Sequence, residues 1–129
     1  MSSMISPKKS SRQSTGHCTI FAVGDTSPPE TNPRSIFSGV RNFLKQGDIR
    51  FCQVERVFSK RGRYHPPGLA RHSRRDPSCA EAYRWAGFDV VSTAGNHSGD
   101  WGYEGVVDTV RTIESLGIRS IGSGRNIDR

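Results

Sequence analysis

Several polar residues in this sequence stand just after apolar runs, and their types suit metal-ion or acid–base chemistry. They are Asp25, Glu55, Asn96 and His97. Carboxylate and amide oxygens are preferred ligands of hard divalent cations. His97 can bind a metal or transfer a proton near neutral pH, and Asp100, three residues later, could orient its ring.

Each of these residues also has a simpler explanation when it is taken alone. Asp25 and Asn96 are types that hydrogen-bond local backbone in turns, and Glu55 next to Arg56 could form a surface ion pair. These residues would form a site only if the fold brings their side chains close together. The elements that position them therefore decide the interpretation.

The apolar runs are typical of short buried strands separated by helices. Strands are expected over residues 18–23, 48–54, 88–94 and 118–122, and helices over 35–47, 76–87 and 103–116. This alternation predicts βαβ units, and therefore an α/β fold with a parallel sheet flanked by helices. Parallel strands deliver their carboxyl ends to one edge, where ligands bind, so the polar residues are expected to meet there.

Particular residues are expected to begin or end the helices, or to form a buried helix face. Asp76 is a suitable cap, Gly47 is a suitable left-handed end, and Gly87 and Gly117 are expected to end the other two helices. The inner face of the first helix is expected to carry its apolar residues, which are Ile36, Phe37, Val40, Phe43 and Leu44.

The three cysteines, Cys18, Cys52 and Cys79, are far apart and odd in number. This spacing argues against a disulfide framework or a zinc knuckle. All three fall in predicted strands or helices, where a free cysteine behaves as a small buried apolar residue.

Four stretches carry a family resemblance: AVGDTS at 22–27, GDIRFCQVE at 47–55, AGNHSGDWG at 94–102 and GSGRN at 122–126. Together they resemble the CapA-type poly-γ-glutamate (capsule) biosynthesis family, which is related in fold to the calcineurin-like metallophosphoesterases. The resemblance covers residues 18–129. The family hallmark is an Asn-His pair followed by Asp and Gly, and Asn96, His97, Asp100 and Gly102 stand in those places.

The resemblance implies a metal-dependent site and a larger fold. It implies that Asp25, Glu55 and Asn96 are ligands of a divalent metal, which would be Mn, Zn, Fe or Mg. It implies that His97, with Asp100, assists the leaving group of a hydrolysed substrate. The fold it implies is the amino-terminal half of a four-layer α/β/β/α metallophosphoesterase-like domain.

The sequence departs from the family pattern in three ways, and these departures keep other interpretations open. Gln53 stands where the family usually has Asn, and TSPPE follows Asp25 in place of small and apolar residues. The family domain also continues well beyond this length and brings further His and Glu ligands. The chain therefore resembles the amino-terminal portion, with an unclosed sheet edge that could support self-association. A non-catalytic polyanion-binding module and an inactive remnant remain alternatives.

An arginine-rich segment follows Glu55, and the chain as a whole has a formal charge of +7. Its cations include Arg61, Arg63, Arg71, Arg74 and Arg75, with no acidic residue before Asp76. The segment is expected either to hold an anionic partner, such as poly-γ-glutamate or a phosphorylated substrate, or to be a solvated loop. The sequence has no helix-turn-helix, zinc-finger or aromatic RNA-binding pattern.

Residues 1–17 are polar and are expected to form a disordered tail before the domain at 18–129. They contain no apolar run of signal-peptide length, and the rest of the sequence contains no run long enough to span a membrane. As written, the chain is expected in the cytoplasm, or at the envelope if an anchor has been lost.

Overall fold

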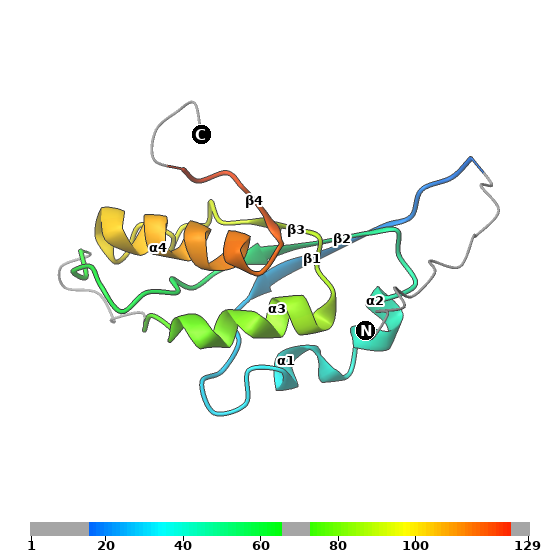
Figure 1. Ribbon diagram of the computed structural model, residues 1–129, viewed down its shortest axis with the longest axis horizontal. Coiled ribbons are helices and arrows are strands. Elements are labelled where there is room, and N and C mark those ends of the chain that lie inside the picture. Colours follow the sequence, from blue (N-terminus) through cyan, green and yellow to red (C-terminus); the bar gives the residue numbers. More distant parts are fainter. Residues whose placement is uncertain (1–15, 66–72, 125–129) are drawn as a thin grey trace, which may run out of the picture.

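The computed structural model describes residues 16–65 and 73–124. This part of the chain forms a four-stranded sheet in the order β1-β2-β3-β4, with every neighbouring pair parallel (Figure 1). The strands are β1 (Ile20–Thr26), β2 (Ile49–Val54), β3 (Val90–Ser92) and β4 (Arg119–Ile121). The predicted α/β fold with a parallel sheet is confirmed. Most of the predicted polar tail, residues 1–15, lies outside the described residues.

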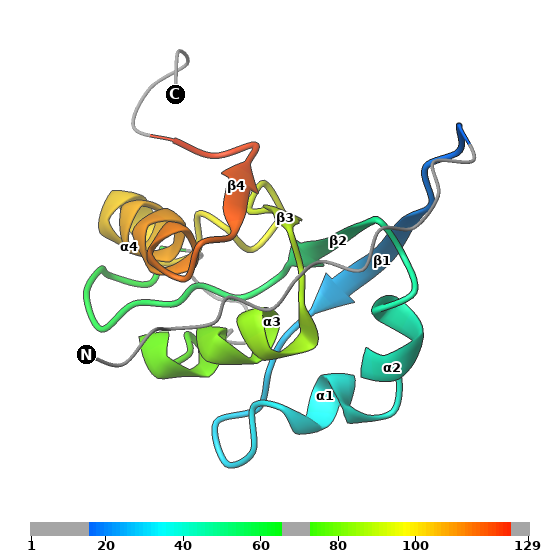
Figure 2. The same cartoon turned by 45° about the vertical axis from the view of Figure 1, so that its right-hand side comes forward.

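The described helices cover one face of this sheet (Figure 2). They are α1 (Ser35–Ser38), α2 (Arg41–Leu44), the 3₁₀ helix η1 (Pro77–Ala80), α3 (Glu81–Ala86) and α4 (Gly102–Ser115). Each connection leads from one strand to its immediate neighbour, and all three proceed in the same direction across the sheet. Because βαβ crossovers are right-handed, all three connections must pass on the same side.

The core lies between the helices and that face, and its centre is an aromatic cluster around Tyr83. The Tyr83 ring is 5.4 Å from Phe37 and 5.9 Å from Phe58, measured between centroids. Its hydroxyl donates to the carbonyl of Thr26 at 3.1 Å and lies 3.0 Å from the Thr26 hydroxyl. Burial raises the pKa of Tyr83, because the charged phenolate is disfavoured away from water.

The cysteine predictions are correct for two of the three residues. Cys52 and Cys79 are buried, and burial raises the pKa of the Cys52 thiol to about 12. Cys18 is exposed, because β1 begins at Ile20 and leaves Cys18 outside the sheet.

The single helix predicted over 35–47 is wrong. The chain forms two one-turn helices, α1 and α2, which are separated at Gly39 and Val40. A glycine in a helix interior is unfavourable, and the break falls at Gly39. Phe37 and Leu44 are buried as predicted, but the other three apolar residues of this segment are exposed: Ile36, Val40 and Phe43.

Gly47 is also not the left-handed helix end that its position suggested, because its φ is not positive. It allows a close approach instead: a Cβ on Gly47 would lie 2.6 Å from Cδ2 of Phe21. The other two glycine predictions are confirmed. Gly87 has a φ of 93° and Gly117 a φ of 77°.

The predicted cap at Asp76 is confirmed, since Asp76 Oδ1 accepts from the backbone amide of Ser78 at 2.9 Å. Among the described residues, no helix has the length and apolar character needed to cross a membrane.

Candidate functional site

The carboxyl ends of β1, β2 and β3 lie side by side. Asp25 pairs with Gln53 in the sheet register, and Gln53 pairs with Ser92. Beyond the strands, the amide of Glu55 donates to the carbonyl of Thr26 at 3.1 Å. The structure therefore brings Asp25 and Glu55 to one rim, as the parallel arrangement predicted.

A β-bulge at Gly24 determines which face of the sheet Asp25 occupies. Val23 pairs with Cys52, whereas the next paired residue is Asp25, which pairs with Gln53. If the strand continued regularly with Gly24 opposite Gln53, Asp25 would pair with Val54, whose side chain is buried under the helices. The bulge thus places the carboxylate on the exposed side of the sheet, in the same row as Gln53.

His97 lies between two carboxylates at this rim. Its Nδ1 is 2.9 Å from Asp100 Oδ2, and its Nε2 is 4.0 Å from Glu55 Oε1. Because a carboxylate can only accept, Nδ1 carries the proton in the hydrogen bond to Asp100. This bond directs Nε2 toward Glu55, which leaves Nε2 as the atom that can exchange a proton at the rim.

The segment between β3 and α4 is a series of tight turns. The amide of Ser98 donates to the carbonyl of Gly95 at 3.1 Å, and the amide of Gly102 donates to the carbonyl of Gly99 at 2.9 Å. Gly95 lets the end of the Gln53 side chain come close, since a Cβ on Gly95 would lie 2.5 Å from Nε2 of Gln53. Asn96 is exposed on these turns, immediately before His97.

Trp101 anchors the far end of these turns against the arginine-rich segment. It is buried, its ring is 5.5 Å from that of Tyr64, and the Arg74 guanidinium lies 4.4 Å above it. The amide of His65 also donates to the carbonyl of Asp100 at 2.9 Å. Sequence reasoning did not identify Trp101, although a large aromatic residue directly after Asp100 was a usable signal.

Arg61 is held by an acidic residue of α4. Its guanidinium contacts both carboxylate oxygens of Asp108, at 2.6 and 3.1 Å, and Ser59 donates to the same carboxylate at 2.6 Å. These hydrogen bonds, first of all that from Arg61, hold the pKa of Asp108 below its usual range. The pair fastens the arginine-rich segment to α4.

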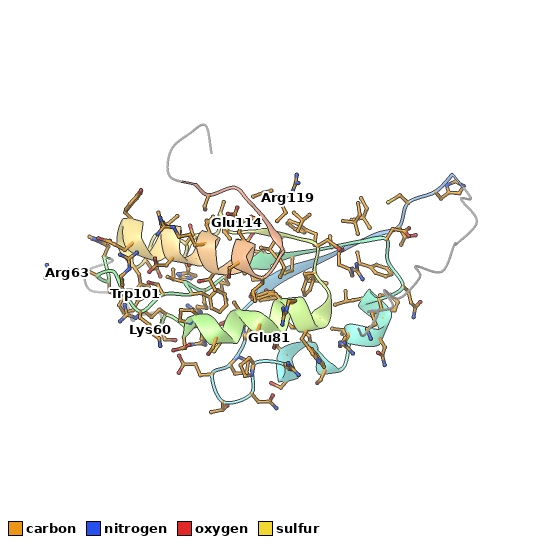
Figure 3. All side chains as sticks on the ribbon, viewed as in Figure 1. Lys60, Arg63, Glu81, Trp101, Glu114 and Arg119 are labelled. Carbon is orange, nitrogen blue, oxygen red and sulfur yellow. The ribbon has the colours of Figure 1, made fainter. Side chains whose placement is uncertain are left out.

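Two of the other predicted anion-binding arginines also bond within the molecule. Nη1 of Arg74 donates to the carbonyl of Arg61 at 2.7 Å, and Nε of Arg75 donates to the carbonyl of Pro28 at 3.0 Å. Arg63 is exposed, and Arg71 lies outside the described residues. The segment thus combines fixed arginines with the exposed Arg63, which lies at the outer end of the segment, away from the sheet (Figure 3).

The residue types at the rim suit a hard divalent cation. Asp25 and Glu55 provide carboxylates, and Asn96 provides a neutral oxygen. Within residues 16–65 and 73–124, no group of three His, Cys, Asp or Glu side chains could hold a metal ion. These side chains alone do not make a complete metal site.

A model of the family described as "Bacterial capsule synthesis protein PGA_cap" matches residues 7–129, which is almost the whole chain. The chain belongs to this family. The resemblance read from Asn96, His97, Asp100 and Gly102 is therefore confirmed, and the four-stranded parallel sheet fits the metallophosphoesterase-like fold of the PGA_cap family.

Individual relatives support the PGA_cap assignment. The chain is 31% and 32% identical over 116 residues to two proteins of Sinorhizobium fredii, the uncharacterized proteins y4sH and y4uA, covering 84% of this chain. It is 26% identical over 93 residues to the "Capsule biosynthesis protein CapA" of Bacillus anthracis, covering 70% of this chain. The match spans 25% of the first two relatives and 23% of the third, so the chain corresponds to about a quarter of their length.

Proposed function

We propose that this chain provides part of a metallophosphoesterase-related hydrolase site in a CapA-type protein of capsule or poly-γ-glutamate biosynthesis. The observation that carries the proposal is the arrangement of His97, which is bonded to Asp100 through Nδ1 and faces Glu55 through Nε2 at the strand ends. Family membership supports the link to capsule synthesis.

In this proposal His97 transfers a proton at Nε2, and Asp100 orients the ring and stabilises it when it is protonated. Asp25, Glu55 and Asn96 would contribute ligands to a divalent cation, which would supply a bound water of lowered pKa. Because these residues are only part of a shell, further ligands must come from another segment or chain.

An anionic chain is the proposed substrate class. The arginine-rich segment adjoins the rim, since the amide of His65 bonds to the carbonyl of Asp100 and Arg74 stacks on Trp101. Arg63 is exposed on the same segment and is available to a polyglutamate or phosphorylated chain.

Thermal unfolding in the presence of Mn²⁺ or Zn²⁺ tests the metal part of the proposal. A cation that binds only the folded state raises the unfolding temperature. We expect this rise in the parent protein and its loss in Asp25→Ala and Asn96→Ala, whereas Asn42→Ala, an exposed asparagine on α2, keeps it. The absence of any rise in the parent protein would reject the metal site.

Binding to poly-γ-glutamate tests the substrate class. We expect binding that weakens steeply with salt and falls in Arg63→Ala, with little change in Arg84→Ala, an exposed arginine on α3. Binding that survives Asn96→Ala, in a protein that shows no response to metal, would favour a non-catalytic polyanion-binding module over a hydrolase.

A further inference from the structure

Asp100, whose carboxylate orients His97, is held more closely from outside its own turn than from within it. Within the turn, the amide of Asp100 donates to the carbonyl of His97 at 3.3 Å, which is longer than the usual range for such a bond. The carbonyl of Asp100 accepts from the amide of His65 at 2.9 Å. Because His65 belongs to the arginine-rich segment, the shorter of these two bonds joins Asp100 to that segment.

Trp101, the next residue, fits closely between two glycines. Gly62 of the arginine-rich segment has a φ of 89°, and a Cβ on it would lie 2.1 Å from the carbonyl oxygen of Trp101. A Cβ on Gly105, in the first turn of α4, would lie 2.9 Å from the Cβ of Trp101. Both approaches are possible because glycine has no side chain. Trp101 is therefore packed directly against the segment on one side and α4 on the other.

The ring of Trp101 packs against two side chains of the same segment. Its centroid lies 5.5 Å from that of Tyr64, and the Arg74 guanidinium lies 4.4 Å from it. Arg74 also donates to the carbonyl of Arg61 at 2.7 Å, and Arg61 is bound to Asp108 of α4. These two arginines thus help to hold Trp101 in place.

A small movement of Asp100 is enough to change the state of His97. Oδ2 of Asp100 lies 2.9 Å from Nδ1 of His97, and a displacement of about 0.7 Å would take the pair beyond hydrogen-bonding distance. The neutral ring would then adopt either tautomer, and Nε2 would no longer be directed toward Glu55. Since Asp100 and Trp101 are consecutive, the packing of Trp101 limits such a displacement.

We propose that Trp101, Gly62 and Arg74 are positioning residues for His97, and that they act by holding Asp100 at hydrogen-bonding distance from its ring. The arginine-rich segment then has a second role beside the contact with an anionic chain proposed above. The inference rests on the proposed function for the use of His97 in proton transfer, whereas the positioning itself needs neither a metal nor a substrate.

Nitrogen-15 NMR of the His97 imidazole at high pH tests the proposal in the full chain. In the parent protein we expect Nδ1 to carry the proton. In Trp101→Leu and Gly62→Ala we expect the ratio of the two tautomers to change at least about fivefold toward the Nε2–H form, because the hydrogen bond to Asp100 is lost. Trp101→Phe, which keeps an aromatic ring beside Arg74, is expected to retain most of the parent ratio.

Each of these variants has a matched control elsewhere in the molecule. Gly117→Ala also places an alanine at a positive φ, 77°, but a Cβ there would have nothing within 4 Å. Trp85→Leu also removes a tryptophan with an arginine 4.4 Å from its ring, since Arg41 lies over Trp85 at that distance. We expect both controls to keep the parent ratio, because they strain the backbone or lose a stacked ring without moving Asp100.

Arg74→Ala and Arg41→Ala form a milder pair, which decides the question if the glycine and tryptophan variants do not fold. Each removes a guanidinium 4.4 Å from a tryptophan ring. We expect the tautomer ratio of His97 to change in Arg74→Ala, by a smaller factor than in Trp101→Leu, and to stay at the parent value in Arg41→Ala.

Circular dichroism establishes that each variant compared is folded. A parent tautomer ratio in folded Trp101→Leu, Gly62→Ala and Arg74→Ala would overturn the proposal, as would an equal change in the matched controls. Because the measurement reports on the imidazole itself, failure of the metal or polyglutamate experiments described above would reject the proposed function and leave this result intact.

Discussion

Nδ1 of His97 lies 2.9 Å from Oδ2 of Asp100, three residues further along the chain, and the Asp100 carboxylate is buried next to the start of α4. The short spacing places both groups within one set of turns. The orientation of the imidazole is therefore fixed locally, by the segment that joins β3 to α4.

Replacing Asp100 with alanine is expected to let the neutral His97 ring adopt both of its tautomers. In the parent protein the proton is held on Nδ1 by the carboxylate, whereas in the variant both neutral tautomers become populated. Nitrogen-15 NMR of the imidazole at high pH measures this population. His17, which is exposed at the start of the described chain, serves as an internal reference, and an unchanged His97 spectrum would contradict the assignment.

Removing the Tyr83 hydroxyl is expected to destabilise the fold. Tyr83→Phe loses the bonds to Thr26 in a buried site and leaves the Thr26 groups without that partner, which costs about 1–2 kcal/mol. Urea unfolding measures the loss. Tyr103→Phe is the control because Tyr103 is 62% exposed, and an equal loss in both variants would show that the buried bonds do not contribute.

Arg74→Ala is expected to loosen the contact between the arginine-rich segment and α4. The change removes a guanidinium stacked 4.4 Å from Trp101 and a donor to the carbonyl of Arg61, a loss of about 1 kcal/mol. Urea unfolding followed by tryptophan fluorescence measures it. Arg63→Ala, an exposed arginine of the same segment, is expected to change stability little, and the reverse ranking would contradict this role.

Acid is expected to destabilise the protein partly through Asp76. Hydrogen bonds from the backbone and side chain of Ser78, and then Lys60, lower the pKa of Asp76 from 3.8 to about 2. Because the pKa is lower in the folded state, the stabilisation is complete above about pH 4 and is lost as the pH falls toward about 2.

Asp76→Asn provides the comparison for this acid effect, since asparagine also caps helices but does not titrate in this range. Unfolding free energies measured between pH 5 and pH 2 should therefore fall less steeply in the variant than in the parent protein. Parallel curves would show that Asp76 makes no contribution to the acid response.

The parallel sheet and its strand ends could be predicted because they depend on patterns visible over short distances. Alternating apolar runs and helical spacing gave the strand and helix order, and Gly87 and Gly117 marked real helix ends. The neighbouring positions of Glu55 and His97 then followed from the general behaviour of parallel strands.

Other features depended on contacts between distant residues, which a single sequence does not display. The bulge at Gly24 exists only relative to β2, and the break between α1 and α2 depends on how Phe37 and Leu44 reach the core. The stacking of Arg74 on Trp101 joins residues from separate loops, so the arginine-rich segment could not be divided into fixed and exposed cations in advance.

The inserted residue at Gly24 also separates two kinds of constraint along β1. Upstream, the effect of a substitution at Val23 depends on how well the new side chain packs beneath the helices. Downstream, a substitution at Asp25 meets solvent and whatever approaches the rim. A strand that ran on regularly through Gly24 would exchange these roles, because Asp25 would then fall opposite Val54 and point beneath the helices.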